Sequence, residues 1–237
     1  MDVLFESARR GLGLPAPLSR AYGADLWLEP QCVVANFVES VDGVVALPDA
    51  KGESGGIVSG GSDADRFLMG LLRACADAVL IGAGTLRAAP RDLWFPESIF
   101  PPAAPLYAEL RALLGFAEAP ALYVVSGSGQ VDPDHPALRQ GGRVLAGKRA
   151  PAEIVAALRR DGRRRILCEG GPGLFGELLA ARLVDELFLT LSPRLFGRWR
   201  GDSRKGLAEA RDLAGAPLEL LSLRRNGSHL FLRYRCG

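Results

Sequence analysis

The sequence predicts an α/β fold built on a mostly parallel sheet with an antiparallel C-terminal hairpin at its edge. Short apolar runs, which are typical of buried parallel strands, alternate with segments of helical periodicity. The clearest unit is residues 163–197, where a strand, a glycine turn, a helix and a second strand follow one another as a βαβ unit. Two alternating runs near the C-terminus flank Asn226-Gly227, a strong hairpin signal.

The elements are expected in a regular order after an irregular beginning. Residues 1–30 contain three prolines and are predicted to be an N-terminal arm, with a short helix near 4–10, that packs on the domain or on a partner subunit. Residues 31–237 are predicted to form one domain. Strands are expected at 32–38, 77–81, 121–126, 143–146, 166–168, 187–191, 218–224 and 230–235, and helices after Ser62, at 107–114, at 151–160 and after Pro172.

Three connections between these elements are expected to be irregular. Residues 51–61 are rich in Gly and Ser, and they form either an ordinary surface loop or a mobile flap over a site. The Pro-rich segment 90–105 carries Trp94, Phe95 and Phe100, for which core filling is favoured over a substrate wall. Residues 198–215 form a polar connection with room for a short helix.

Composition and charge exclude several classes of protein. The 48% hydrophobic and 24% charged residues are typical of a globular protein, and a net charge of +2 argues against a nucleic-acid partner. No run of about 18 apolar residues or signal-peptide core is present, so no membrane partner is expected. The four cysteines are widely spaced, which predicts reduced thiols and a cytoplasmic location. Zinc-ligand spacing, a G-x-S-x-G elbow and a Walker A sequence are all absent.

The turn after the strand at 166–168 is the strongest candidate for a site. Glu169 lies at the carboxyl end of that strand, where open α/β sheets bind ligands. Gly170 and Gly171 permit positive φ and a close approach to the backbone. Pro172 suits the first position of a helix, whose free N–H groups favour phosphates. A tight strand–helix turn without a ligand is an equally weighted interpretation, and the Rossmann G-x-G-x-x-G is absent.

Similar turns follow other predicted strands. Gly82-Ala83-Gly84-Thr85 and Ser126-Gly127 each place backbone N–H groups and a small polar side chain at the same edge of the sheet. Asp42-Gly43 follows the first strand, although turn chemistry alone explains Asp42 equally well. Arg73 is expected near a helix C-terminus, where an arginine more often interacts with the helix dipole and with solvent than with a ligand.

Four stretches together resemble the reductase domain of riboflavin biosynthesis, which belongs to the dihydrofolate-reductase-like superfamily. They are residues 36–43, 71–87, the strand end at Ser126, and 168–197, in the family's order, and the resemblance covers about residues 31–235. It implies a three-layer αβα fold, a homodimer and NADPH as cofactor. The implied reaction is hydride transfer to C1′ of the ribosyl group of 5-amino-6-(5-phosphoribosylamino)uracil or its pyrimidine analogue.

The resemblance also implies roles for individual residues. Arg73 would bind the substrate phosphate, and the acidic residue Glu169 would contact the substrate and is the candidate catalytic residue, with Ser54 and Leu93 as further substrate contacts. The implied cofactor contacts are Val38, Asp42, Gly82, Gly84, Thr85, Ser126, Gly170, Gly171, Pro172, Gly173, Leu174 and Phe175. A cation is needed for the 2′-phosphate of NADPH, and Lys148 or Arg149 is the candidate.

The chain departs from the family pattern at several positions. Asn36 stands where many members carry lysine, and residues 88–95 lack the common D-D-P-x-L-T-x-R run, so Arg87 or Arg91 could replace its arginine. No H-x-E with P-C-x-x-C occurs, so a stand-alone reductase without a deaminase is expected. The alternatives are a reductase of the same fold acting on another carbonyl, imine or pterin, and a non-catalytic nucleotide-binding protein.

Overall fold

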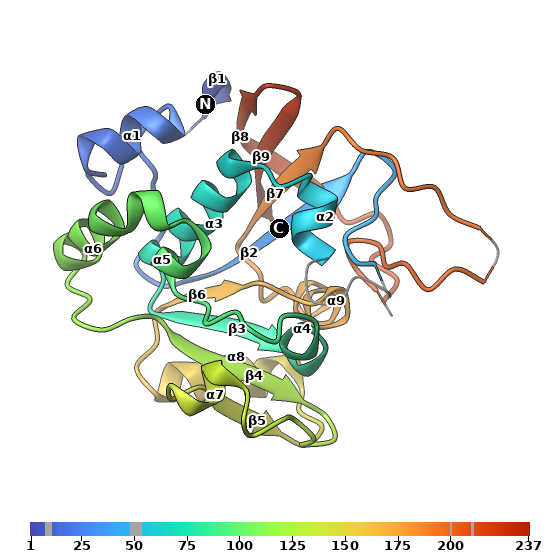
Figure 1. Cartoon of the computed structure of the whole chain (residues 1–237). Helices are drawn as coiled ribbons and strands as arrows, with labels where there is room; N and C mark the ends of the chain where they lie inside the picture. The colour runs from blue at the N-terminus through green and yellow to red at the C-terminus, as the bar shows by residue number, and fades with distance from the viewer. Residues whose placement is uncertain (8–10, 48–53, 200, 210) are drawn as a thin grey trace.

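A nine-stranded sheet forms the middle layer of the computed structural model, which describes residues 1–7, 11–47, 54–199, 201–209 and 211–237 (Figure 1). The strand order is β1-β8-β9-β7-β2-β6-β3-β4-β5. The strands are β1 (Asp2–Glu6), β2 (Cys32–Ser40), β3 (Ala78–Gly82), β4 (Ala121–Ser126), β5 (Arg143–Ala146), β6 (Arg165–Cys168), β7 (Glu186–Ser192), β8 (Leu218–Asn226) and β9 (His229–Cys236).

Helices cover both faces of this sheet, which confirms the predicted three-layer αβα fold. They are α1 (Ala16–Tyr22), α2 (Ser54–Ser59), α3 (Asp63–Cys75), α4 (Ala83–Ala88), α5 (Pro96–Ile99), the 3₁₀ helix η1 (Pro101–Ala103), α6 (Ala104–Leu113), α7 (Pro136–Arg139), α8 (Pro151–Arg160) and α9 (Pro172–Ala180). Core residues of α1, α3 and α6 pack on one face, which we call the α3 face, and those of α8 and α9 pack on the other.

Most of the sheet is parallel, and its edge is antiparallel, as the sequence predicts. Strands β7, β2, β6, β3, β4 and β5 run in the same direction. Strand β9 pairs antiparallel with β7, and β8 completes the C-terminal hairpin. The carboxyl ends of the parallel strands therefore share one edge of the sheet, which we call the carboxyl edge.

The near-continuous apolar runs follow from burial on both faces. Along β2, Val34 packs with the core of the α3 face, and Val33 packs with the core of the opposite face. Both residues are 2% exposed. Alternate residues of a strand point to opposite faces, so a strand covered on both sides is apolar throughout.

The N-terminal segment joins the sheet instead of forming an irregular arm with a helix at 4–10. The prediction of that helix is wrong, because Asp2–Glu6 is strand β1, which pairs antiparallel with β8; residues 8–10 lie outside the described part. Helix α1 and the segment after it bury Leu18 and Leu26 in the core of the α3 face. Residues 2–6 form a strand because they pair with the distant C-terminal hairpin, and the local periodicity of the sequence does not reveal this pairing.

Three expectations for the connections can be compared with the structure. Ser54–Ser59 forms helix α2 within the stretch expected to be a flexible loop, and residues 51–53 lie outside the described part. Trp94 is 2% exposed and fills the core, as favoured from the sequence. The described residues of 198–215 contain no helix, and an isolated bridge between Ala46 and Lys205 holds this segment.

Candidate active site

The carboxyl edge brings together the turns that the sequence singled out. Strands β2, β6, β3 and β4 are neighbours in that order, so the turns that follow them are neighbours too. The N–H of Gly82 donates to the carbonyl of Gly170 at 2.6 Å, and the N–H of Glu169 donates to the carbonyl of Leu80 at 3.1 Å. These two bonds fasten the glycine turn after β6 to the end of β3.

The glycine turn itself requires residues without side chains. Gly170 has φ +97°, and a Cβ there would lie 3.2 Å from the ring of Phe37. A Cβ on Gly171 would lie 3.3 Å from Thr85 Oγ1, whereas a Cβ on Gly173 would meet nothing within 4 Å. The backbone at the start of α9 is therefore closely held on one side and open on the other. This geometry fits a bound diphosphate, because helix N–H groups can reach an anion there.

The other predicted cofactor contacts surround this turn. Phe175 is buried on α9 with its ring 4.8 Å from that of Phe37, and Val38 lies beside Phe37 on β2. Ser126, at the end of β4, is buried, and its hydroxyl donates to the carbonyl of Gln130 at 3.4 Å. Gly84 is exposed on α4, where a Cβ would meet nothing within 4 Å.

Asp42 holds a loop together. Its carboxylate accepts hydrogen bonds from the N–H groups of Phe196 at 3.1 Å and Gly197 at 2.6 Å, and from the hydroxyl of Ser40. The Ser40 hydroxyl, followed by the backbone N–H groups, lowers the pKa of this carboxyl. Asp42 thereby fixes the chain after β7 against the end of β2, which gives the residue a structural role at the same edge.

A buried ion-pair network joins Arg73 to two acids. Arg73 is 0% exposed. Its Nη2 lies 2.7 Å from Glu169 Oε2 and 3.1 Å from Asp92 Oδ2, and its Nε lies 2.9 Å from Glu169 Oε1. Nη1 donates to the carbonyl of Phe95 at 3.3 Å. Helix α3 supplies the arginine, the end of β6 supplies Glu169, and the segment before α5 supplies Asp92, so the network connects three distant parts of the sequence.

The network fixes the charge and the orientation of Glu169. Burial raises the pKa of the Glu169 carboxyl, and the Arg73 guanidinium opposes that rise. The two carboxylates, foremost Glu169, raise the pKa of Arg73 against the effect of its own burial. Arginine stays cationic at every accessible pH, so the guanidinium favours the ionised form of the Glu169 carboxylate against the effect of burial. Sequence reasoning missed Asp92, and the only signal for it was a carboxylate within the altered run 88–95.

The remaining predicted residues are Ser54, Leu93 and four basic candidates. Ser54 begins α2, and its hydroxyl accepts from the N–H of Leu47 at 2.8 Å. Leu93 is half-buried next to Asp92. The four basic candidates, Arg87, Arg91, Lys148 and Arg149, are exposed, and the last two follow β5 at the carboxyl edge.

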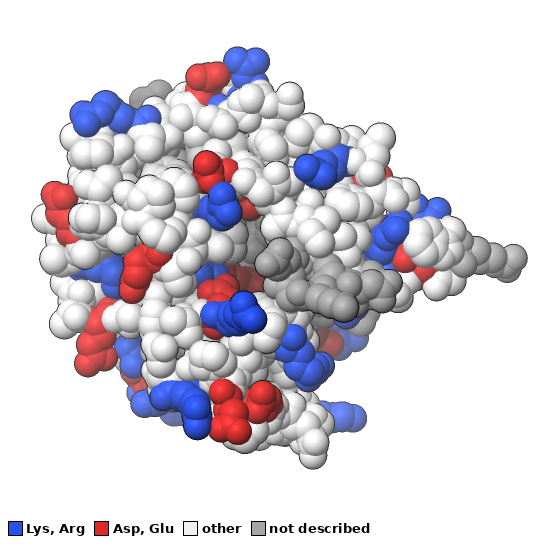
Figure 2. Space-filling model, viewed as in Figure 1, with Lys and Arg blue, Asp and Glu red and all other residues white. Residues whose placement is uncertain are grey.

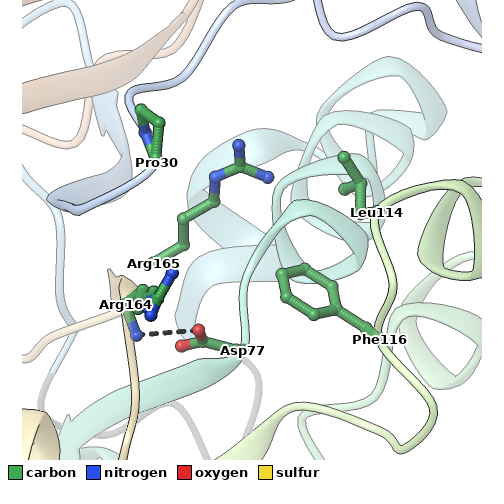
Figure 3. Close-up of a pocket in the computed structure, with 6 residues that line it drawn as sticks. All are labelled: Pro30, Asp77, Leu114, Phe116, Arg164 and Arg165. Carbon is green, nitrogen blue, oxygen red and sulfur yellow. Dashed lines mark hydrogen bonds between the residues drawn. The ribbon is translucent and has the colours of Figure 1, made fainter.

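A pocket of about 200 Å³ lies at the opposite edge of the sheet, where the parallel strands begin (Figure 3). Its lining residues are Pro30, Asp77, Leu114, Phe116, Arg164 and Arg165. The N–H of Arg164 donates to Asp77 Oδ2 at 2.7 Å, and Asp77 Oδ1 is enclosed without a hydrogen-bond partner among the described residues. This pocket contains none of the predicted site residues.

Three further observations concern the surface, the metal chemistry and the helices of the described residues. On the face shown in Figure 2, acidic and basic side chains are interspersed. No described group of three or more His, Cys, Asp or Glu side chains is arranged to hold a metal ion. Within the described part of the chain, no helix has the length and apolar composition that a membrane span requires.

The fold and the site together define a three-layer α/β protein with its candidate site at the carboxyl edge of the sheet. The model of the RibD C-terminal domain family matches residues 31–231, and the chain belongs to this family. This membership confirms the resemblance to riboflavin-biosynthesis reductases and the prediction of an oxidoreductase. No curated protein matches the chain by sequence.

Solved structures show the same fold. A pyrimidine reductase-like protein from Corynebacterium diphtheriae has a TM-score of 0.68 at 24% identity, over 92% of this chain and 97% of that chain. Acinetobacter baumannii RibD has a TM-score of 0.66 at 17% identity, over 87% of this chain and 58% of that chain. The riboflavin biosynthesis reductase Rib7 of Saccharomyces cerevisiae has a TM-score of 0.56 at 13% identity, over 94% of this chain and 99% of that chain.

Proposed function

We propose that the chain is an NADPH-dependent reductase that transfers a hydride to C1′ of the ribosyl group of 5-amino-6-(5-phosphoribosylamino)uracil or its pyrimidine analogue. The observation that carries the proposal is the glycine turn at the start of α9, which lies directly after the buried, ion-paired Glu169. Membership of the RibD C-terminal domain family supports the same reaction.

The chain has the residues to hold the cofactor at this edge. The open backbone from Gly170 to Phe175 would receive the diphosphate, with Thr85 beside it and Ser126 at the next strand end. Lys148 and Arg149, exposed after β5, would supply the cation for the 2′-phosphate. When bound, NADPH supplies the hydride, and the protein orients it.

Glu169 is the residue proposed to act on the substrate. Hydride addition at C1′ requires an imine there, and an imine is a better hydride acceptor when it carries a proton and a positive charge. A carboxylate held ionised beside that carbon favours the charged form. Arg73 and the backbone bond from Glu169 to Leu80 hold the carboxylate in place, so no reorganisation is needed when charge develops.

The substrate phosphate has two possible partners in this structure. Arg73 can take it only if the phosphate replaces Asp92, whose side chain is 24% exposed and forms the outer part of the network. Arg87 and Arg91 are exposed and need no such exchange. The homodimer and the cytoplasmic location predicted from the sequence belong to the same proposal.

A second candidate is a reductase of the same fold with another substrate. The observation that favours it is the hydrogen bond between Arg73 and Asp92. Asp92 lies in the run 88–95, which departs from the family pattern, and it takes the place on Arg73 that a substrate phosphate would need. Turnover of a carbonyl, imine or pterin instead of the phosphoribosylaminopyrimidine would identify this candidate.

The proposal is tested by the Glu169→Gln variant. We expect turnover of the phosphoribosylaminopyrimidine, followed as loss of NADPH absorbance, to fall about 100-fold or more, because the ionised carboxylate is removed. The affinity for NADPH should change little, because the glycine turn is untouched. Glu109→Gln, at an exposed glutamate of α6, is the matched control and should keep full activity. Unchanged turnover in Glu169→Gln would remove Glu169 from the mechanism.

A further inference from the structure

His135 lies buried between helix α7 and the segment that carries Asp92. It directly precedes α7, and it is 5% exposed. Its Nδ1 accepts a hydrogen bond from the N–H of Ala137 at 3.2 Å. Its Nε2 lies 3.1 Å from the carbonyl oxygen of Ala89, at the end of α4. The ring therefore joins the start of α7 to a residue that lies 46 positions earlier in the chain.

These two contacts determine which ring nitrogen carries the proton. A carbonyl oxygen can only accept a hydrogen bond, so Nε2 must be the donor to Ala89. The N–H of Ala137 can only donate, so Nδ1 must be unprotonated. Only the neutral ring with its proton on Nε2 makes both bonds at once. Because both nitrogens have partners within the protein, the ring of His135 is arranged to hold two segments together and not to transfer a proton.

The Ala89 carbonyl begins the segment that orients Asp92, residues 89–95, which we call the Asp92 turn. This carbonyl accepts a second hydrogen bond, from the N–H of Asp92, at 3.1 Å. Asp92 Oδ1 accepts from the N–H of Trp94 at 2.8 Å, and Asp92 Oδ2 lies 3.1 Å from Arg73 Nη2. The donor of His135 and the N–H of Asp92 therefore meet on one oxygen, at the start of the turn that places Asp92 on Arg73.

Trp94 lies near the other end of the Asp92 turn, and His135 packs against it as well. The centroids of the two rings are 5.9 Å apart, and the ring planes are inclined by 40°. Trp94 is 2% exposed and has φ +57°, a left-handed conformation that a bulky residue adopts only at a cost in free energy. Such a conformation persists where its neighbours impose it, and residues of this kind gather at functional sites. His135 contacts both parts of the turn, one through a hydrogen bond and the other through its ring.

The Asp92 turn borders the proposed reaction site. Asp92 and the carbonyl of Phe95 accept hydrogen bonds from the outer N–H groups of Arg73, which holds Glu169 through Nε and Nη2. Leu93, a predicted substrate contact, is a half-buried member of the turn. A displaced turn would move Leu93 and uncover the outer side of Arg73, whereas the bonds between Arg73 and Glu169 would remain.

We propose that His135 is a positioning residue for the reaction, because it fixes the Asp92 turn as the wall against which the substrate binds beside Glu169. The inference rests on the proposed function and adds to it a residue that acts through the turn and touches no reactant. Since Arg73 continues to hold Glu169, loss of the contact from His135 weakens substrate binding and leaves the hydride step nearly unchanged. In kinetic terms, KM rises and kcat does not fall.

Two substitutions separate the two hydrogen bonds of the ring. Counted from the backbone, the side-chain amide of asparagine lies in the position of Nδ1, and that of glutamine lies in the position of Nε2. His135→Asn therefore keeps the bond to Ala137, as a good helix N-cap, and loses the donor to Ala89. His135→Gln keeps a donor for Ala89 and loses the cap. Asp134→Asn is the matched control, because Asp134 is an exposed neighbour whose ion pair with Arg139 lies at the surface.

Steady-state kinetics with the phosphoribosylaminopyrimidine and NADPH measure the role of His135, and thermal unfolding measures the stability of each variant. His135→Asn should raise the KM for the pyrimidine about tenfold, as the loss of one buried hydrogen bond predicts, with kcat within about twofold of the wild type. His135→Gln should keep a KM close to that of the wild type, although it should unfold at a lower temperature than His135→Asn. Asp134→Asn should match the wild type in both measurements. A purely structural role predicts instead that KM rises as the unfolding temperature falls.

The inference is overturned if His135→Asn leaves KM unchanged, or if His135→Gln raises KM as much as His135→Asn does. If one variant does not fold, the other decides the question by comparison with Asp134→Asn, because each has its own expected KM. A wild-type protein without turnover would overturn the proposed function and the kinetic role with it.

The hold of His135 on the Asp92 turn can be tested without turnover. The chain has two histidines, so nitrogen NMR of protein labelled at histidine can be assigned with a His229→Asn variant. The ring of His135 should show a protonated Nε2, protected from exchange with water, and an unprotonated Nδ1. A proton on Nδ1, or an Nε2–H that exchanges freely, would contradict the bond to the Ala89 carbonyl on which the inference depends.

Discussion

Glu169 and Asp65 are two buried acids on the same face of the sheet, and they have opposite surroundings. Glu169 is held by the Arg73 guanidinium at 2.7 Å and 2.9 Å. Asp65 has no cation in contact within the described residues, and burial raises its pKa to about 6. The folded protein provides Glu169 with an ion-pair partner, and this partner holds its carboxylate in one position. The burial of Asp65 without an ion pair costs stability in the folded protein.

Removing the cation should break the first half of this comparison and have the largest effect. Arg73→Met leaves Glu169 and Asp92 buried without a partner, and we expect the free energy of unfolding to fall by about 3–5 kcal/mol. Urea denaturation measures it. Arg66→Met is the control, because Arg66 pairs with Asp63 at the surface and should contribute less than about 1 kcal/mol. Equal effects of the two variants would contradict the role of Arg73.

Removing the charge of Asp65 should raise the free energy of unfolding, whereas removing the Arg73 cation should lower it. The folded pKa of about 6 exceeds the ordinary value of 3.8, so the wild-type protein loses stability as the pH rises through this window. Asp65→Asn should be more stable than the wild type at pH 7.5, by on the order of 3 kcal/mol.

That advantage should shrink as the pH falls below about 4, where Asp65 is protonated in both the folded and the unfolded states. Thermal unfolding across this range measures it, with His229, Glu169 and Arg66 unchanged in both proteins. A variant that is less stable than the wild type at pH 7.5 would show that Asp65 has a stabilising partner.

The outer acid of the network should matter least. Asp92 is 24% exposed and lies 3.1 Å from Arg73, so solvent replaces part of what Asp92→Asn removes. We expect the free energy of unfolding, measured by urea denaturation, to fall by about 1 kcal/mol, because Glu169 remains paired with Arg73. A loss as large as that of Arg73→Met would mean that Asp92, and not Glu169, is the main partner of Arg73.

The sequence predicted those parts of the molecule that depend on local pattern. The apolar runs identified the parallel strands, Asn226-Gly227 identified the hairpin, and the glycine turn after β6 identified the edge where the predicted contacts gather. Strand β1 was missed because its pairing partner is at the other end of the chain. The pairing of Arg73 with Asp92, and the burial of Asp65, depend on three-dimensional neighbours that no spacing in the sequence reveals.

The most direct test of the account is the titration of the purified protein with NADPH and NADH, repeated for Gly171→Asp and Gly171→Ala. The account predicts tighter binding of NADPH than of NADH. It also predicts that Gly171→Asp binds NADPH about 100-fold more weakly than the wild type, because a carboxylate would face the diphosphate. Gly171→Ala introduces the same Cβ, 3.3 Å from Thr85 Oγ1, but no charge, so its affinity for NADPH should fall much less. Binding of neither nucleotide, or equal affinity in Gly171→Asp and the wild type, would contradict the placement of the cofactor at this edge.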